Sequence, residues 1–253
     1  MNQFRVSTLP FSAFALDRFL GGLVEIGISS IELGKTHFQS LDKQTAASLQ
    51  SETGLRFKSI LTTEDIAGPN GLREQIAILD TAQKLSIPMV CVSSGGREDA
   101  TEAEIELIID RLTTLTQEAE RRSLTLAFYP HHGWMAYNLE RTERIFNAIP
   151  SGSFKFYYCS YHFQRAGDDP VVALERLADR LCSVYFDCGV DPGTGETPLW
   201  APETDYRAVF RAIRRTGYSD EIMLIYLGLK VESPDPIIEG IVRARALLNE
   251  LME

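Results

Sequence analysis

The chain has 253 residues, 44% of them hydrophobic, and a formal net charge of −10. Its length is close to the roughly 250 residues of one (β/α)8 barrel, and the hydrophobic fraction can supply a large core. The acidic balance disfavours nucleic-acid phosphates and anionic lipid as partners, and no apolar run approaches the roughly 18 residues that a membrane-spanning helix needs.

The N-terminal segment enters a strand-like run at once and lacks the basic-then-apolar pattern of a secretory signal. The four cysteines form no CxxC pair, and most lie in or beside apolar runs. They are Cys91, Cys159, Cys182 and Cys188. We therefore expect a cytoplasmic protein with reduced thiols and no zinc ribbon.

Short apolar or β-branched runs alternate with longer helical patterns along the whole chain. This alternation predicts repeated βα units and a parallel sheet. The predicted strands are Arg5–Thr8, Ser30–Leu33, Arg56–Leu61, Met89–Ser93, Leu124–Tyr129, Phe154–Cys159, Ser183–Asp187 and Ile222–Tyr226. Eight strands predict closure, so the expected fold is a single α/β domain over residues 1–253, a (β/α)8 TIM barrel. An open, doubly wound sheet is the alternative, although no GxGxxG follows the first strand.

Between the strands lie segments with apolar residues at helical spacing, such as Leu72–Leu85 and Glu102–Arg121. Pro150 follows a third such segment, Leu139–Ile149, where a helix should already have ended. The longest irregular stretch is Gly189–Glu203. At the end of a barrel strand, we expect this stretch to form a loop that walls the active-site mouth.

The carboxyl ends of barrel strands converge on one mouth, so polar residues at or near the predicted strand ends are the candidate site. They are Thr8, Glu32, His37, Lys58, Ser93, Ser94, Tyr129, His131, Cys159, His162, Tyr185, Asp187 and Tyr226. All four histidines of the chain lie on or just after such ends, which predicts a shared pocket. His131 and His132 are adjacent, so along an extended backbone only one of them is expected to face the mouth.

Several of these residues have two interpretations. Glu32 lies between apolar neighbours on a predicted buried strand, where an unpaired charge is costly, so a pocket role is favoured over a surface one. His37 is either a pocket residue or a solvated loop residue. Arg165 follows the sixth strand and is either a ligand for a phosphate or carboxylate or an ordinary surface arginine.

The cysteine that ends the sixth strand also allows alternatives. Cys159 and His162 are close enough in sequence to form a thiolate–imidazole pair, but Cys159 is equally able to pack as a small apolar residue. Together with His131, Asp187 and Cys188 they are chemically sufficient for a zinc site, although nothing in their spacing requires it. The tyrosines near these ends are expected to be core or rim aromatics, or to stack on a sugar face.

Several segments, in this order and spacing, resemble the xylose-isomerase-like TIM barrels, a superfamily of sugar-phosphate isomerases and epimerases. The segments are Val6–Phe11, Gly27–Leu33, Leu124–Gly133, Cys159–His162 with Arg165–Asp168, Gly193–Glu196 and Thr216–Tyr218. The resemblance covers nearly the whole chain and implies the same barrel fold.

Metal-dependent members of this family take Glu, Asp, His and Glu from strands five to eight. The matching positions here are Tyr129, Cys159, Tyr185 and Ile225, the last shifting to Tyr226 if the register differs by one. None of the four ligands is retained. The resemblance therefore implies a barrel without the usual cation or its acid–base glutamates, and no cofactor is expected.

These observations predict an isomerase- or epimerase-like protein that binds a small sugar or polyol at the mouth. A non-catalytic binding or regulatory barrel is the alternative. For a catalytic protein, Glu32 or His162 is the expected base, and Tyr129, Tyr185 or His131 would polarise a carbonyl oxygen. The further predicted ligand contacts are His37, Lys58, Cys159, Arg165, Asp187 and Tyr226. Dimers and tetramers are common in the resembled family, so a homo-oligomer is a possible assembly.

Overall fold

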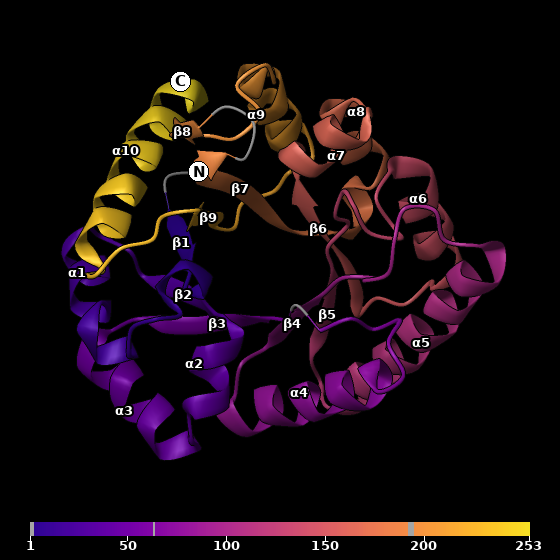
Figure 1. The fold of residues 1–253 in the computed structure, drawn as a ribbon, viewed down its shortest axis with the longest axis horizontal. Coiled ribbons are helices and arrows are strands. Elements are labelled where there is room, and N and C mark those ends of the chain that lie inside the picture. Colours follow the sequence, from indigo (N-terminus) through magenta and orange to yellow (C-terminus); the bar gives the residue numbers. More distant parts are fainter. Residues whose placement is uncertain (1–2, 63, 192–194) are drawn as a thin grey trace.

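The structure is a computed structural model that describes residues 3–62, 64–191 and 195–253. Its parallel strands pair in the order β6-β5-β4-β3-β2-β1-β9-β7, and the pairing of β6 with β7 closes the ring (Figure 1). These strands are β1 (Phe4–Ser7), β2 (Ser30–Leu33), β3 (Arg56–Leu61), β4 (Met89–Val92), β5 (Thr125–Phe128), β6 (Phe154–Cys159), β7 (Leu181–Asp191) and β9 (Ile222–Leu227). The predicted (β/α)8 barrel is confirmed, and the open-sheet alternative is wrong.

Helices surround the barrel on its outside (Figure 1). They are α1 (Leu20–Glu25), α2 (Lys35–Ser40), α3 (Lys43–Thr53), α4 (Gly71–Leu85), α5 (Glu102–Arg121), α6 (Leu139–Ala148), α7 (Ser160–Ala166), α8 (Pro170–Arg176), α9 (Tyr206–Arg215) and α10 (Asp235–Met252), with 3-10 turns at Leu9–Phe11, Leu16–Arg18 and Ala178–Arg180. Their ends follow local chemistry. A capping box between Thr101 and Glu104 starts α5, and the Asn138 side chain caps α6. Of the helices described, none is long and apolar enough to cross a membrane.

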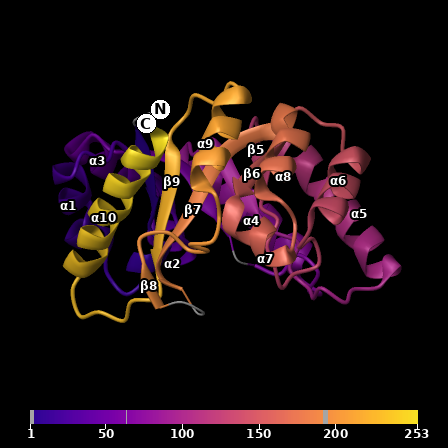
Figure 2. The same cartoon turned by 90° about the horizontal axis from the view of Figure 1, so that it is seen from above.

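The stretch predicted to be irregular, Gly189–Glu203, instead begins as strand. β7 runs on to Asp191, and β8 (Gly195–Thr197) pairs with it in antiparallel fashion. Figure 2 shows this pair at the end of the barrel opposite the two chain termini. The landmark residues Gly193 and Thr194 lie outside the described residues. A strand pair forms here because β7 continues beyond the barrel and gives β8 an edge to bind, and of this stretch Trp200 lines the mouth cavity described below.

Two hydrophobic clusters follow from the alternation of side chains along the strands. On β6, Phe156 and Tyr158 pack outward into the large core beneath the helices, whereas Tyr157 and Cys159 point into the barrel. The inner cluster comprises Leu61, Cys91, Ala127, Tyr129, Tyr157, Cys159, Tyr161, Tyr185, Trp200, Ala201, Met223 and Ile225. The four positions that the sequence resemblance matched to metal ligands therefore all belong to this inner cluster.

Candidate functional site

A cavity of about 280 Å³ opens at the carboxyl ends of the barrel strands. It is lined by Leu9, Leu61, Thr62, Ser93, Tyr129, His131, His132, Trp134, Tyr161, His162, Tyr185, Asp187, Trp200, Ile225 and Leu227. We call this the mouth cavity. Three tyrosines, three histidines and both tryptophans of the chain contribute to its wall, so rings dominate it.

The segment after β5 supplies two adjacent histidines. The Tyr129 N–H donates to the Val92 carbonyl at 2.8 Å, which continues the pairing of β5 with β4. The chain then turns: Gly133 has φ +83°, and the Trp134 N–H donates to the His131 carbonyl at 3.2 Å. Both His131 and His132 line the mouth cavity. The expectation that only one would face it is wrong, because it assumed an extended backbone.

His162 lies at the centre of a chain of hydrogen-bonded side chains. It occupies the first turn of α7, directly after β6. Its Nε2 is 2.5 Å from the Tyr129 Oη, and its Nδ1 is 2.7 Å from the His132 Nδ1. One arrangement of protons satisfies both contacts: the Tyr129 hydroxyl donates to Nε2, and the His162 Nδ1–H donates to His132. The three groups therefore connect the buried phenol to the partly exposed His132.

All three histidines favour the neutral form. Burial, followed by the neighbouring histidines, holds the pKa of His162 well below its usual value. Burial likewise lowers the pKa of His131 to about 4. For His132, burial and then the positive charge of Arg165 lower the pKa. At neutral pH these imidazoles are uncharged and able to accept a proton.

The Cys159 thiol donates to Asp187 Oδ2 at 3.0 Å, and the same oxygen is 3.9 Å from His162 Nε2. Burial, then the Asp187 carboxylate, raises the pKa of Cys159 well above its usual value. The same two causes raise the pKa of Tyr129 and of Tyr185. Cys159 is therefore a protonated thiol packed among apolar neighbours, which favours the second interpretation over a thiolate–imidazole pair.

The four positions that correspond to the family's metal ligands do not fit a hard divalent cation. The rings of Tyr129 and Tyr185 are 5.3 Å apart, so these positions do meet. However, neither phenol ionises readily, the Cys159 thiol holds its proton, and Ile225 has no donor atom. Such a cation needs anionic or carbonyl oxygens.

Two neighbouring groups of side chains have donors suited to a softer metal. One ligand atom from each of Cys159, His162 and Asp187 lies within 4.8 Å of the others, and His131, His132 and His162 form a similar group. Sulfur and imidazole donors of this kind suit zinc. Both nitrogens of the shared His162 already contact Tyr129 and His132, and the Cys159 thiol contacts Asp187. Zinc would therefore have to displace these contacts.

Two predicted site residues lie below the mouth cavity. Glu32 is fully buried inside the barrel, where its Oε2 accepts from Ser59 Oγ at 2.9 Å and from Tyr157 Oη at 2.8 Å. Lys58 lies towards the opposite end, and its Nζ is 2.7 Å from Asp220 and 3.0 Å from Glu221. Neither residue lines the cavity. For Lys58 the reason is its place near the start of β3, three residues before the strand ends.

Three other predicted residues do not line the cavity. His37 is buried, with Nδ1 2.8 Å from Thr8 Oγ1 and Nε2 3.0 Å from the Phe14 carbonyl. Tyr226 packs on Gly240 of α10, and its Oη accepts from Arg243 at 3.0 Å. Ile225 faces the mouth in its place, which settles the register of this strand. Arg165 is exposed on α7 and does not line the cavity.

Sequence reasoning did not identify either tryptophan as part of the site. Trp134 stacks on His131 with ring centroids 4.2 Å apart, and Trp200 meets Tyr161 edge-on at 5.0 Å. One available signal was that the only two tryptophans in the chain both follow barrel strands, in segments that reach the mouth. Large aromatic residues in such segments are candidates for the wall of a binding pocket.

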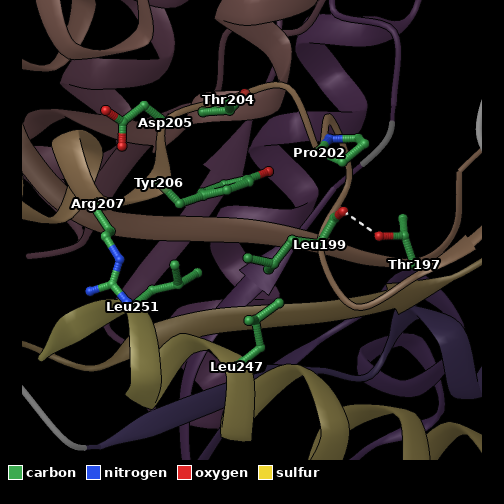
Figure 3. Close-up of a pocket in the computed structure, with 9 residues that line it drawn as sticks. All are labelled: Thr197, Leu199, Pro202, Thr204, Asp205, Tyr206, Arg207, Leu247 and Leu251. Atoms are coloured by element: carbon green, nitrogen blue, oxygen red, sulfur yellow. Dashed lines mark hydrogen bonds between the residues drawn. The ribbon is translucent and has the colours of Figure 1, made fainter.

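A different cavity, of about 350 Å³, lies between α10 and the segment that leads into α9. Figure 3 shows Leu199, Leu247, Leu251 and the ring of Tyr206 facing one another across it. No histidine or cysteine is among its described lining residues. This cavity therefore lacks the imidazole groups that line the mouth cavity.

Comparison with known proteins agrees with this architecture. A model of the family described as "Xylose isomerase-like TIM barrel" matches residues 22–247, and no functionally curated protein matches. A probable 3-DHS dehydratase, AsbF, from Bacillus anthracis is 14% identical, with a TM-score of 0.78 over 99% of both chains. An L-ribulose 3-epimerase is 16% identical, with a TM-score of 0.75 over 100% of this chain and 95% of that one.

A third solved structure, the IOLI protein with a bound zinc atom, is 16% identical, with a TM-score of 0.78 over 99% of this chain and 98% of that one. At these identities the solved structures show a shared fold alone. They leave the reaction and the cofactor of this chain to be inferred from its own residues.

Proposed function

Because the chain belongs to the xylose isomerase-like TIM barrel family, we propose that it is an isomerase- or epimerase-type protein that binds a small carbohydrate or polyol ligand at the mouth of its barrel. Residues 1–253 would form one such domain. Epimerases and a dehydratase are among the proteins of similar fold, which is consistent with proton transfer next to a carbonyl or hydroxyl group. We assign this transfer to His162 and Tyr129.

The contact that carries the proposal is the 2.5 Å approach of Tyr129 Oη to His162 Nε2 within the mouth cavity. An isomerase or epimerase needs a base that removes a proton from carbon and an acid that supports the developing enediolate oxygen. Neutral His162 is suited to the first role. Tyr129, which keeps its proton because its pKa is raised by burial, is suited to the second.

The proton balance is as follows. When a ligand carbonyl oxygen enters, the Tyr129 hydroxyl donates to it instead of to His162, and Nε2 becomes free to accept the proton from the neighbouring carbon. The resulting imidazolium would be stabilised by the Asp187 carboxylate, whose Oδ2 is 3.9 Å away, and by donation from Nδ1 to His132. In an isomerisation, Nε2 returns the proton to the adjacent carbon of the enediolate while a hydroxyl proton moves from one enediolate oxygen to the other, so no proton is gained or lost. An epimerisation would need a second acid on the opposite face of the enediolate.

We also propose that this transfer proceeds without the divalent cation that the family resemblance implies. The support is chemical: Tyr129, Tyr185, Cys159 and Ile225 offer no anionic oxygen at the corresponding positions. Elemental analysis of protein purified without chelator should find far less than one equivalent of zinc, manganese or magnesium. Stoichiometric zinc that His162→Asn removes would instead establish the relocated zinc site.

Deuterium exchange tests the proton transfer directly. Protein in D2O with a free ketose, such as D-fructose or L-ribulose, should remove the proton NMR signal of the carbon next to the carbonyl. Substitution His162→Asn should lower the exchange rate by about 10²- to 10⁴-fold, the usual contribution of a general base. Tyr129→Phe should also lower it.

Tyr226→Phe is the matched control, because it deletes a buried tyrosine hydroxyl that lies on the helix side of a strand end. Equal loss of exchange in Tyr129→Phe and Tyr226→Phe would contradict the assignment and indicate a general loss of structure.

Non-catalytic ligand binding is the second candidate. It is favoured by Ile225, which places an inert side chain where metal-dependent relatives hold a glutamate. On this proposal the same ketoses would raise the midpoint of thermal unfolding, because they bind only the native state, yet no exchange or product would appear.

A further inference from the structure

The charge of the mouth cavity limits what it can hold, and this inference rests on the function proposed above. Among the described residues that line the cavity there is one carboxylate, Asp187, and no lysine or arginine. The three histidines of the lining favour the neutral form. The wall therefore provides no full positive charge at neutral pH.

An anionic group would be poorly stabilised in such a cavity. A phosphate or carboxylate that leaves water needs a cation or several convergent N–H donors to replace its hydration. The mouth cavity would instead place the anionic group near the Asp187 carboxylate. Burial, and then the negative charge of Asp187, raise the pKa of Tyr129 and of Tyr185. Like charges in a setting of low dielectric constant repel strongly.

Basic residues elsewhere on this face do not compensate. Arg165 is close enough to lower the pKa of His132, but its side chain is exposed and outside the cavity lining. Lys35 pairs with Glu64, and Arg97 pairs with Asp99 on the surface. Arg165 is therefore a rim cation that a phosphorylated ligand could use, and it provides a direct test.

The remaining wall suits a ring with an apolar face. The stacked rings of His131 and Trp134 contribute to the wall, as do Trp200 and Tyr161, which meet edge-on. Leu9, Leu61, Ile225 and Leu227 complete the apolar part. Aromatic walls of this kind contact the C–H faces of rings, while a few polar groups fix the orientation.

We propose that the ligand of the mouth cavity is an uncharged ring-forming molecule with an apolar face, one that carries neither phosphate nor carboxylate. The proposal separates this chain from the sugar-phosphate chemistry suggested by the superfamily to which its sequence is similar. It follows from the charges and rings of the cavity itself.

Calorimetric titration with matched ligand pairs tests the proposal. The pairs are D-fructose with D-fructose 6-phosphate and D-glucose with D-glucuronate. The neutral member of at least one pair should bind at least tenfold more tightly than its charged partner, and Arg165→Gln should leave its affinity unchanged. Equal or tighter binding of the charged members, lost in Arg165→Gln, would overturn the inference and leave the proposed function intact.

A charge introduced at the rim sharpens the test. Leu227 is partly exposed at the end of β9, where a longer polar side chain can be accommodated. Leu227→Lys should reduce or reverse the preference for the neutral sugar, whereas the uncharged control Leu227→Gln should not. An unchanged preference in Leu227→Lys would contradict the electrostatic explanation. If neither member of any pair binds the wild-type protein, the proposed function fails and the inference fails with it.

Discussion

At the amino end of the barrel, Glu221 accepts from Ser30 Oγ at 2.5 Å, from Arg56 at 3.0 Å and from Lys58 at 3.0 Å. Burial alone would raise the pKa of Glu221, but the hydrogen bonds from Ser30 and Lys58 outweigh it and the pKa is lowered. At the carboxyl end the histidines and Tyr129 favour their neutral forms instead, because the histidines have lowered pKa values and Tyr129 has a raised one.

This difference in ionisation suggests that the amino end of the barrel serves stability and the carboxyl end serves proton transfer. Paired charges at the amino end satisfy one another and have no proton to exchange at neutral pH. The uncharged imidazoles at the mouth can accept a proton, and the phenol beside them can donate one. Conditions or substitutions that act on one end should therefore leave the other largely unaffected, and the following predictions test that separation.

The largest expected effect on stability lies between the two ends. Glu32 and Arg5 are buried in the barrel; burial raises the pKa of Glu32 and the Arg5 charge opposes that rise, while the Glu32 charge helps to raise the pKa of Arg5. Glu32→Gln would remove this compensating charge from Arg5. Removal of one member of a buried charge pair costs about 3–5 kcal/mol. Because these two charges attract each other while their hydrogen bonds go to other side chains, the free energy of unfolding in urea should fall by up to about that amount.

Glu64→Gln is the control, because Glu64 pairs with the exposed Lys35 and should cost less than about 1 kcal/mol. The double variant Arg5→Met with Glu32→Gln should recover part of the loss. A double variant that is less stable by the sum of the two single losses would show that the charges are not coupled.

The second prediction concerns pH and the mouth. Because the pKa of His131 is about 4 in the folded protein against an ordinary 6.5, the unfolded chain takes up its proton first as the pH falls. Stability from this group is present above about pH 6.5 and is lost towards pH 4. The loss should be roughly 1–3 kcal/mol between pH 7 and pH 4, and His131→Asn should remove it.

The measurement is the difference in unfolding free energy between wild type and His131→Asn at several pH values, which cancels the titration of carboxylates common to both. A constant difference across this range would contradict the assignment of a depressed pKa to His131.

The smallest effect on stability is expected from substitution of Lys58, which is one of the residues that sequence reasoning assigned to the site. Its ammonium pairs with Asp220 and Glu221 at the amino end, and its side chain is 24% exposed. Lys58→Met should cost no more than about 1 kcal/mol of stability and leave deuterium exchange by the protein unchanged. A tenfold fall in the deuterium exchange rate of Lys58→Met, with an unchanged free energy of unfolding, would contradict the assignment of separate roles to the two ends.

Local sequence patterns predicted most of the fold. β2, β3 and β6 begin and end at the predicted residues, because alternating apolar side chains and flanking turns are local signals. The family resemblance matched Tyr129, Cys159, Tyr185 and Ile225 to a single site, and all four lie in the inner cluster.

The depth of each inward side chain was not predictable in this way. The register between β2 and β3 shifts between Ile31 and Glu32, so that Glu32 lies beside Ser59 rather than Lys58. How far a side chain lies below the mouth depends on such shifts in register between neighbouring strands, and the sequence of one strand does not show them. For this reason Glu32 was expected at the mouth but lies beneath it.

The sequence by itself determined the barrel and the family, since both are encoded in residue type and spacing along one chain. The tertiary structure decided which side chains share the mouth. His132, Trp134 and Trp200 come from loop segments that line the mouth, and Tyr226 faces a helix although it lies near the end of β9. Both outcomes depend on packing between distant segments, and the proposed proton transfer and the cavity lining without lysine or arginine depend on that packing too.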